Sequence, residues 1–154
     1  MKKILFLIFV ISFSSQAQKN LKIDNDHIYV FNKDLEFSII KISKNRTTSR
    51  YNTTYVAKKG TRFISMYLKF KNTSKETKTI DFSNILLLTD NNQTIKIDFV
   101  VKAMKLTANT DRLKIKLKPG KKRMIAIEFE SPVEKDEKID QLIINEKVVS
   151  LSYN

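Results

Sequence analysis

The sequence predicts an all-β protein, an antiparallel β-sandwich of about seven to nine strands that follows a cleaved signal peptide. Three observations support this fold class. Apolar and polar residues alternate with a period of two in several short segments, turn-forming residues separate these segments, and no convincing helical period follows the N-terminal apolar run. No internal repeat or second domain is visible, so we expect a single domain after the leader.

The composition limits the chemistry that the chain can perform. Its 154 residues are 42% apolar, enough to bury a core in one domain. It has no cysteine and a single histidine, which excludes disulfides, thiolate metal sites, a catalytic thiol and a histidine-rich metal site. Lysine and arginine number 29 against 16 aspartate and glutamate residues, for a formal net charge of +13. A surface of this sign attracts anionic partners.

The N-terminus has the pattern of a secretory signal peptide. Two lysines follow Met1, residues 4–13 are almost wholly apolar, and residues 14–17 are short or polar, so we expect cleavage after Ala17. A membrane anchor is the alternative, but the apolar run has about half of the roughly 20 residues that a span requires. Export without cysteine favours a bacterial periplasmic or secreted protein with no transmembrane span after cleavage. The predicted organisation is a signal peptide (1–17), a polar leader that could add an edge strand (18–34) and a β-sandwich (35–154).

Two strands separated by a long loop are predicted at the start of the domain. Residues 35–42 alternate well enough to form the first strand, and residues 43–60 are polar and basic, which predicts the loop. Residues 62–70 give the clearest alternation and predict a half-buried central strand. Its inward-facing residues are Ile64, Met66, Leu68 and Phe70.

A return strand and a hairpin are predicted next. Turn residues precede a short strand that begins at residues 77–80. The apolar run 85–88, a polar connection and the alternating segment 94–101 predict a β-hairpin. Residues 100–109 are ambiguous, because their apolar spacing could also form one helical turn.

Four short strands complete the predicted sandwich. Residues 113–118 alternate strictly until Pro119 and Gly120, which have the chemistry of a type II turn. The next strand covers residues 124–130 and ends before Pro132. The last two strands are predicted at residues 141–144 and 147–152.

Three segments carry a resemblance to a known family. They are Gly60–Asn72, Phe82–Asp90 with the polar turn after it, and Leu117–Gly120 leading to a strand that ends in Phe129-Glu130-Ser131-Pro132. Together they resemble the DUF4352 family of exported, immunoglobulin-like β-sandwich domains, over about residues 35–152. The turn after Asp90 departs from the family pattern, with Asn91-Asn92 where a glycine is common, and asparagine tolerates the left-handed conformation. The resemblance implies an immunoglobulin-like fold and export, and it offers no common catalytic residue.

A metal site in the leader can be imagined but is not predicted. Asp24, Asp26 and His27 are residue types that bind metal ions. Neighbouring residues of a flexible leader rarely converge on one ion, however, and no fourth ligand is in view.

Two further groups of acidic residues suggest calcium binding or glycoside hydrolysis, but structural roles explain them better. Asp90, Asn92 and Asp98 suggest a calcium loop, but the glycine and the terminal glutamate of that motif are missing, and a hairpin turn explains them better. Glu128 and Glu130 share one face of a strand, and a glycosidase needs two carboxylates near each other. Their alternation with apolar residues, however, predicts a solvated outer face. We predict no enzymatic activity and no cofactor.

Basic and aromatic residues are the candidate binding groups. They lie in the predicted 43–60 loop, around Gly60 and on the 113–118 strand, where three lysines share one face. The alternative to a binding role is that the lysines form a solvated face that only keeps the protein soluble. The candidate residues are Arg46, Arg50, Tyr51, Tyr55, Lys58, Lys59, Arg62, Lys114, Lys116 and Lys118.

Two functional hypotheses follow. The first is an exported, non-catalytic module that binds an anionic glycan, a lipid headgroup or an envelope protein through a basic face and the 43–60 loop. The alternative is a small envelope-associated hydrolase or metal-binding protein, which would need convergent carboxylates or three ligands around a cleft. The sequence favours the first. Nucleic acid is not an expected partner, because the chain is predicted to be exported and no recognition helix is visible.

Overall fold

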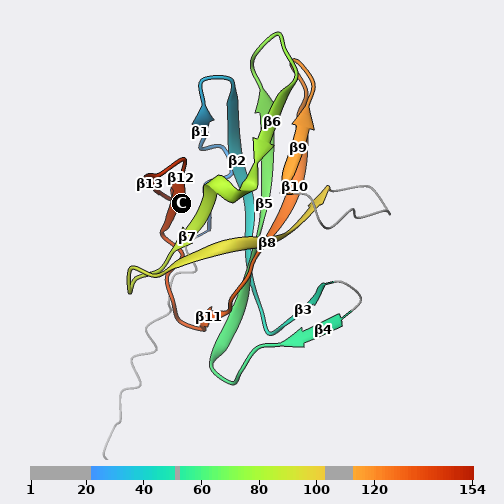
Figure 1. Cartoon of the computed structure of the whole chain (residues 1–154). Helices are drawn as coiled ribbons and strands as arrows, with labels where there is room; N and C mark the ends of the chain where they lie inside the picture. The colour runs from blue at the N-terminus through green and yellow to red at the C-terminus, as the bar shows by residue number, and fades with distance from the viewer. Residues whose placement is uncertain (1–21, 51–52, 103–112) are drawn as a thin grey trace, which may run out of the picture.

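A computed structural model describes residues 22–50, 53–102 and 113–154, and these residues form an antiparallel all-β fold (Figure 1). The predicted signal peptide and most of the ambiguous 100–109 segment lie outside the described residues. The elements are β1 (Tyr29–Asn32), β2 (Leu35–Asn45), β3 (Thr47–Arg50), β4 (Thr53–Val56), β5 (Thr61–Asn72), β6 (Lys78–Asp81), the 3₁₀ helix η1 (Phe82–Asn84), β7 (Ile85–Leu88), β8 (Thr94–Lys102), β9 (Lys114–Leu117), β10 (Lys122–Phe129), β11 (Val133–Glu134), β12 (Gln141–Ile144) and β13 (Lys147–Ser150).

The main sheet is one continuous antiparallel sheet with the strand order β1-β2-β5-β10-β8-β7-β12-β13, and β11 pairs with the start of β5. Two short ladders, β3-β4 and β6-β9, stand beside it. The predicted hairpin of residues 85–101 is confirmed as β7-β8, and the two strands predicted at residues 141–144 and 147–152 pair as β12-β13. This arrangement confirms the predicted all-β, antiparallel fold class.

The first and last segments of the main sheet meet, so the sheet curls around its core. Ile23 forms an antiparallel bridge with Tyr153. The Tyr29 hydroxyl accepts a hydrogen bond from the backbone N–H of Ser152 at 2.8 Å, which joins the start of β1 to the residues after β13. Because β1 also pairs with β2, the leader supplies an edge strand of the sheet.

The core lies between the curled sheet and the β6-β9 ladder. Ile64, Met66, Leu68 and Phe70 of β5 are all fully buried, as the alternation predicts. The Phe70 ring stacks on Phe37 with centroids 4.9 Å apart and meets Phe82 edge-on at 5.7 Å. These ring pairs join β2, β5 and η1 into one apolar cluster, and burial of such rings is a main source of folding free energy.

Asn72 holds the end of β5 to the β6-β9 ladder. Its side chain is fully buried, and its Nδ2 donates to the carbonyl oxygens of Glu76 at 2.7 Å and Leu117 at 2.9 Å. Its Oδ1 accepts from the N–H of Ser74 at 2.9 Å. A buried amide with every group paired fixes this junction, because an unpaired polar group there would be costly.

The prediction of a long loop at residues 43–60 is wrong, because most of this segment forms strands. β2 continues to Asn45, three residues beyond the predicted strand end, and β3 and β4 then form a hairpin. The polar composition of this segment arises because the hairpin stands outside the core, where most of its side chains face solvent.

Among the described residues, no helix is long and apolar enough to cross a membrane.

Candidate functional site

Arg50, one of the predicted binding residues, is buried and ion-paired. Only 6% of its side chain is exposed. Its Nη1 lies 2.7 Å from Asp98 Oδ2, its Nε lies 3.0 Å from Glu128 Oε2, and its Nη2 donates to the Phe129 carbonyl oxygen at 2.7 Å. Its guanidinium carbon also lies 5.3 Å from the centre of the Phe63 ring. Arg50 therefore anchors the β3-β4 hairpin to the outer face of the main sheet.

The same contacts account for the acidic residues of the sequence motifs. Glu128 also accepts a hydrogen bond from the Thr48 hydroxyl, so it is not the solvated outer residue that its alternation predicts. Asp98 points to Arg50, whereas the backbone N–H of Asp90 donates to Glu137 Oε1 at 2.7 Å. Asp98 thus helps to hold the β3-β4 hairpin through Arg50 and does not form a calcium loop with Asp90.

Most of the other candidate residues near the hairpin that the structure describes are exposed. Arg46 and Tyr55 are exposed, and Tyr51 lies outside the described residues. Lys58 and Lys59 are exposed in the turn before β5, and Arg62 is half-buried at its start. The Arg62 Nη1 donates to the Thr61 carbonyl oxygen at 2.7 Å.

The candidate lysines 58 and 59 do not meet the lysines of β9. β11 pairs with β5 at Thr61 and Arg62, whereas β9 contacts Asn72 at the opposite end of the same strand. A strand rises by about 3.3 Å per residue, so roughly 35 Å of β5 lies between the two points of contact. Figure 1 shows β3-β4 and β6-β9 at opposite ends of β5.

The lysines of β9 differ in what they contact. Lys114 lies 3.1 Å from Asp81. A hydrogen bond from Ser83 and then the contact with Lys114 lower the pKa of Asp81, so that carboxylate stays charged beside Lys114. Lys116 and Lys118 have no carboxylate partner among the described residues. They line a shallow recess together with Thr77, Leu117, Lys121, Lys122 and Arg123.

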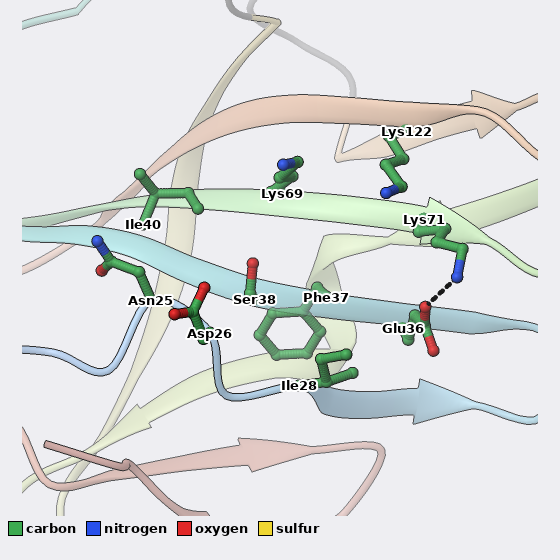
Figure 2. Close-up of a pocket in the computed structure, with 10 residues that line it drawn as sticks. All are labelled: Asn25, Asp26, Ile28, Glu36, Phe37, Ser38, Ile40, Lys69, Lys71 and Lys122. Atoms are coloured by element: carbon green, nitrogen blue, oxygen red, sulfur yellow. Dashed lines mark hydrogen bonds and ion pairs between the residues drawn. The ribbon is translucent and has the colours of Figure 1, made fainter.

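A second recess adjoins the first and shares Lys122 with it (Figure 2). It has a volume of about 330 Å³, at the lower end of small-molecule sites. The turn before β1, the outer face of β2, the end of β5 and the start of β10 form it. Its lining residues are Asn25, Asp26, Ile28, Glu36, Phe37, Ser38, Ile40, Lys69, Lys71 and Lys122.

Lys71 of β5 and Lys122 of β10 are direct cross-strand partners in this recess. Residues opposite each other in an antiparallel pair have Cα atoms roughly 5 Å apart, and like charges there are destabilising. Glu36 of β2 lies 2.8 Å from Lys71, which offsets one of the two charges. Neither Lys122 nor Lys69 has a carboxylate partner in the described part of the chain.

These cations form one surface, here named the basic face, which consists of Lys69, Lys71, Lys116, Lys118, Lys121, Lys122 and Arg123. Sequence reasoning selected Lys116 and Lys118 as binding residues but not Lys69 or Lys71. The outward positions of these two lysines on β5 were readable from the alternation. The alternation does not reveal the register that places Lys71 beside Lys122. It also does not reveal the fold that places both lysines beside β9.

The acidic residues and the histidine of the leader do not converge on one point. The Asp24 side chain accepts from the N–H of Asp26 at 3.0 Å, and the His27 ring packs against Tyr29 with centroids 4.6 Å apart. In the three described ranges, no group of three or more histidine or acidic side chains is placed to hold a metal ion.

Comparison with known proteins gives a family and a fold. The model of the family described as "Domain of unknown function (DUF4352)" matches residues 13–152. An uncharacterized beta-sandwich protein from Clostridium difficile 630 has a similar crystal structure, with a TM-score of 0.51 and 15% identity over 88% of each chain. A conserved hypothetical protein from Bacillus anthracis has a TM-score of 0.54 and 13% identity, over 84% of this chain and 94% of that one. No curated protein matches.

Proposed function

The chain belongs to the DUF4352 family, and we propose that it is an exported, non-catalytic β-sandwich module. In this proposal its basic face binds an anionic component of the bacterial cell envelope. The family description names no activity, and the two similar crystal structures show the fold alone. The proposal therefore depends on this chain's own surface.

One observation carries the proposal: cations from β5, β9, β10 and the β9-β10 turn gather around Lys122 with few carboxylates among them. Lys69, Lys116, Lys118 and Lys122 have no ion-pair partner among the described residues. Lys71 and Lys122 are held side by side although their repulsion costs stability. Adjacent charges of one sign add to a local potential that attracts anions and speeds their association.

Other features support the export and non-catalytic parts of the proposal. The basic, apolar and small-residue segments of the N-terminus have the order of a signal peptide. The carboxylate of Glu128, which with Glu130 was the candidate acid and base pair, is paired with Arg50 and Thr48. A carboxylate held in this way positions a hairpin and is poorly placed to transfer protons.

The test is a binding assay on protein purified from cells that express the full chain. The panel contains acidic glycans, neutral glycans, and vesicles with and without anionic lipid, each at low and high salt. The test variant replaces Lys116, Lys118, Lys121 and Lys122 with glutamine. The matched control replaces Lys58, Lys59, Lys135 and Lys138, four exposed lysines outside the basic face, so that net charge changes equally.

We expect binding to an anionic member of the panel that weakens with salt, because exposed charges are screened within about 10 Å at 0.1 M ionic strength. The test variant should lose most of this binding while the control keeps it. Equal losses in both variants would show that only net charge matters and would overturn the assignment to the basic face. Absence of binding at low salt would overturn the proposed function.

A further inference from the structure

We propose that the recess in Figure 2 binds one sugar residue of an acidic polysaccharide, whose carboxylate meets Lys69 and Lys122 and whose hydroxyls meet Asp26 and Ser38. This inference rests on the proposed function and names the class of its ligand. It identifies a ligand that carries both negative charge and hydroxyl groups.

The backbone of β2 shapes one wall of this recess. The pairing of β2 with β5 shifts register between Ile39 and Lys41, so β2 has an irregularity at Ile40. Ile39 is fully buried in the core, whereas its neighbour Ile40 lines the recess on the outer face. A bulge of this kind redirects a side chain, and it is often found next to functional sites.

Polar groups without internal partners point into the recess. The Asp26 carboxylate and the Ser38 hydroxyl make no side-chain hydrogen bond or ion pair within the described residues. Ser38 lies directly opposite Lys69 in the register of β2 and β5. Figure 2 shows Asp26, Ser38 and Lys69 along the same side of the strands, with Lys71 and Lys122 beyond them. The recess therefore offers a charged acceptor, a hydroxyl and unpaired ammonium groups.

This mixture of charges discriminates between classes of anion. A polyphosphate or an anionic lipid surface presents negative groups throughout, and the carboxylates of Asp26 and Glu36 would repel it. A sugar hydroxyl can instead donate to Asp26, and a hydrogen bond to a charged group is worth more than a neutral one. A uronate residue supplies this donor together with a carboxylate for the lysines.

The apolar part of the recess suits the carbon face of a sugar ring. Ile28 is 58% exposed and lines the recess with Ile40. Small-molecule sites usually combine apolar walls with a few placed polar groups, and these two side chains provide the walls.

The surroundings favour a polymer over a free sugar. Lys122 belongs to both recesses, and Lys116, Lys118 and Lys121 line the second recess with it. Repeated uronate carboxylates along one chain would meet these successive lysines. The second recess would then hold neighbouring residues of the same polysaccharide through charge alone.

Calorimetric titration with four probes tests this inference: an oligogalacturonate, an inorganic polyphosphate, a neutral dextran oligosaccharide and phosphatidylglycerol vesicles. The decisive variant is Asp26→Ala, because Asp26 is exposed and its side chain has no partner that the fold would lose. Ser38→Ala is a second test variant. Asp136→Ala is the matched control, an exposed carboxylate outside the recess whose loss changes net charge equally.

We expect Asp26→Ala to weaken the binding of only one of the two anionic polymers. Asp26→Ala should weaken oligogalacturonate binding about tenfold, because a charge-assisted hydrogen bond is lost, and should leave polyphosphate binding unchanged or tighter. Ser38→Ala should weaken only the oligogalacturonate, and Asp136→Ala should weaken neither. Dextran should not bind.

The other outcomes separate this inference from the function it rests on. If Asp26→Ala does not weaken oligogalacturonate binding, if it weakens both polymers equally, or if vesicles bind and oligogalacturonate does not, the recess is not a sugar site, while anion binding by the basic face stands. Dextran binding as tight as oligogalacturonate would also overturn the inference. If no probe binds at low salt, the inference and the proposed function fail together.

Discussion

The guanidinium of Arg50 and the carboxylate of Glu128 lie 3.0 Å apart, although 78 residues separate them in the chain. Arg50 comes from the β3-β4 hairpin and Glu128 from the outer face of β10. Asp98 of β8 completes the arrangement, with a 2.7 Å contact to the same guanidinium. One buried cation thus joins a polar hairpin to two strands of the main sheet.

Replacing Arg50 with alanine should destabilise the protein by about 3 kcal/mol. Removal of one partner from a buried pair leaves an uncompensated charge, and Glu128 is 14% exposed. Urea unfolding measures the change in free energy. Arg46→Ala, at an exposed position of the same region, should shift it by at most about 0.5 kcal/mol. Equal effects of the two substitutions would contradict the anchoring role.

Replacing Lys122 with threonine should raise stability while it weakens anion binding. The substitution removes a like-charge contact with Lys71 and places a β-branched residue in a strand, which together are worth about 0.5 kcal/mol. Urea unfolding and the binding assay are run on the same preparation. A less stable variant would show that Lys71 and Lys122 do not repel each other in the folded protein.

The turn between β12 and β13 should become more stable when Glu146 is replaced by glycine. Asn145 and Glu146 both have positive φ, at 47° and 66°, as in a type I′ hairpin turn. Glycine adopts this conformation at no steric cost, so Glu146→Gly should gain about 0.5 to 1 kcal/mol against unfolding. Lys147→Gly, one residue later in β13, should instead destabilise the protein, because glycine weakens a strand.

Stability should fall between about pH 10 and about pH 12 because of Tyr153. Burial, followed by the charge of Asp140 and by Tyr29, raises the pKa of Tyr153 from 10.0 to about 12. Above pH 10 the unfolded chain loses this proton while the folded chain keeps it, so ionisation favours unfolding as pH rises. Unfolding free energies of the wild type and Tyr153→Phe across this range provide the measurement. The wild type should decline more steeply, and parallel curves would rule out Tyr153 as the cause.

Much of the fold was predictable because its signal is local. The period of two in residues 62–70 placed Ile64, Met66, Leu68 and Phe70 in the core, where they are fully buried. The apolar run 85–88 and the segment after it predicted the β7-β8 hairpin. The resemblance to the DUF4352 family, read from three turn and strand segments, is confirmed by a match over residues 13–152.

The candidate site was less predictable, because its residues come together through pairings across the chain. Arg50 was predicted as a binding residue of a loop, since its neighbours in sequence are polar and basic. Its carboxylate partners lie 48 and 78 residues away, and nothing local marks them. The recess in Figure 2 draws Asp26, Ser38, Lys69 and Lys122 from four separate segments.

The all-β class, most strand positions, the inward faces of the strands and the excess of positive charge follow from the order of residues alone. Each of these depends on residue type or on a period of two along one segment, so each is visible in the order of residues. The folded structure was needed to show that Arg50 is an anchor, that Lys71 lies beside Lys122, and that Lys58 and Lys59 lie at the other end of β5 from β9. Register and sheet order settle these relations, because antiparallel pairing joins residues that the chain separates.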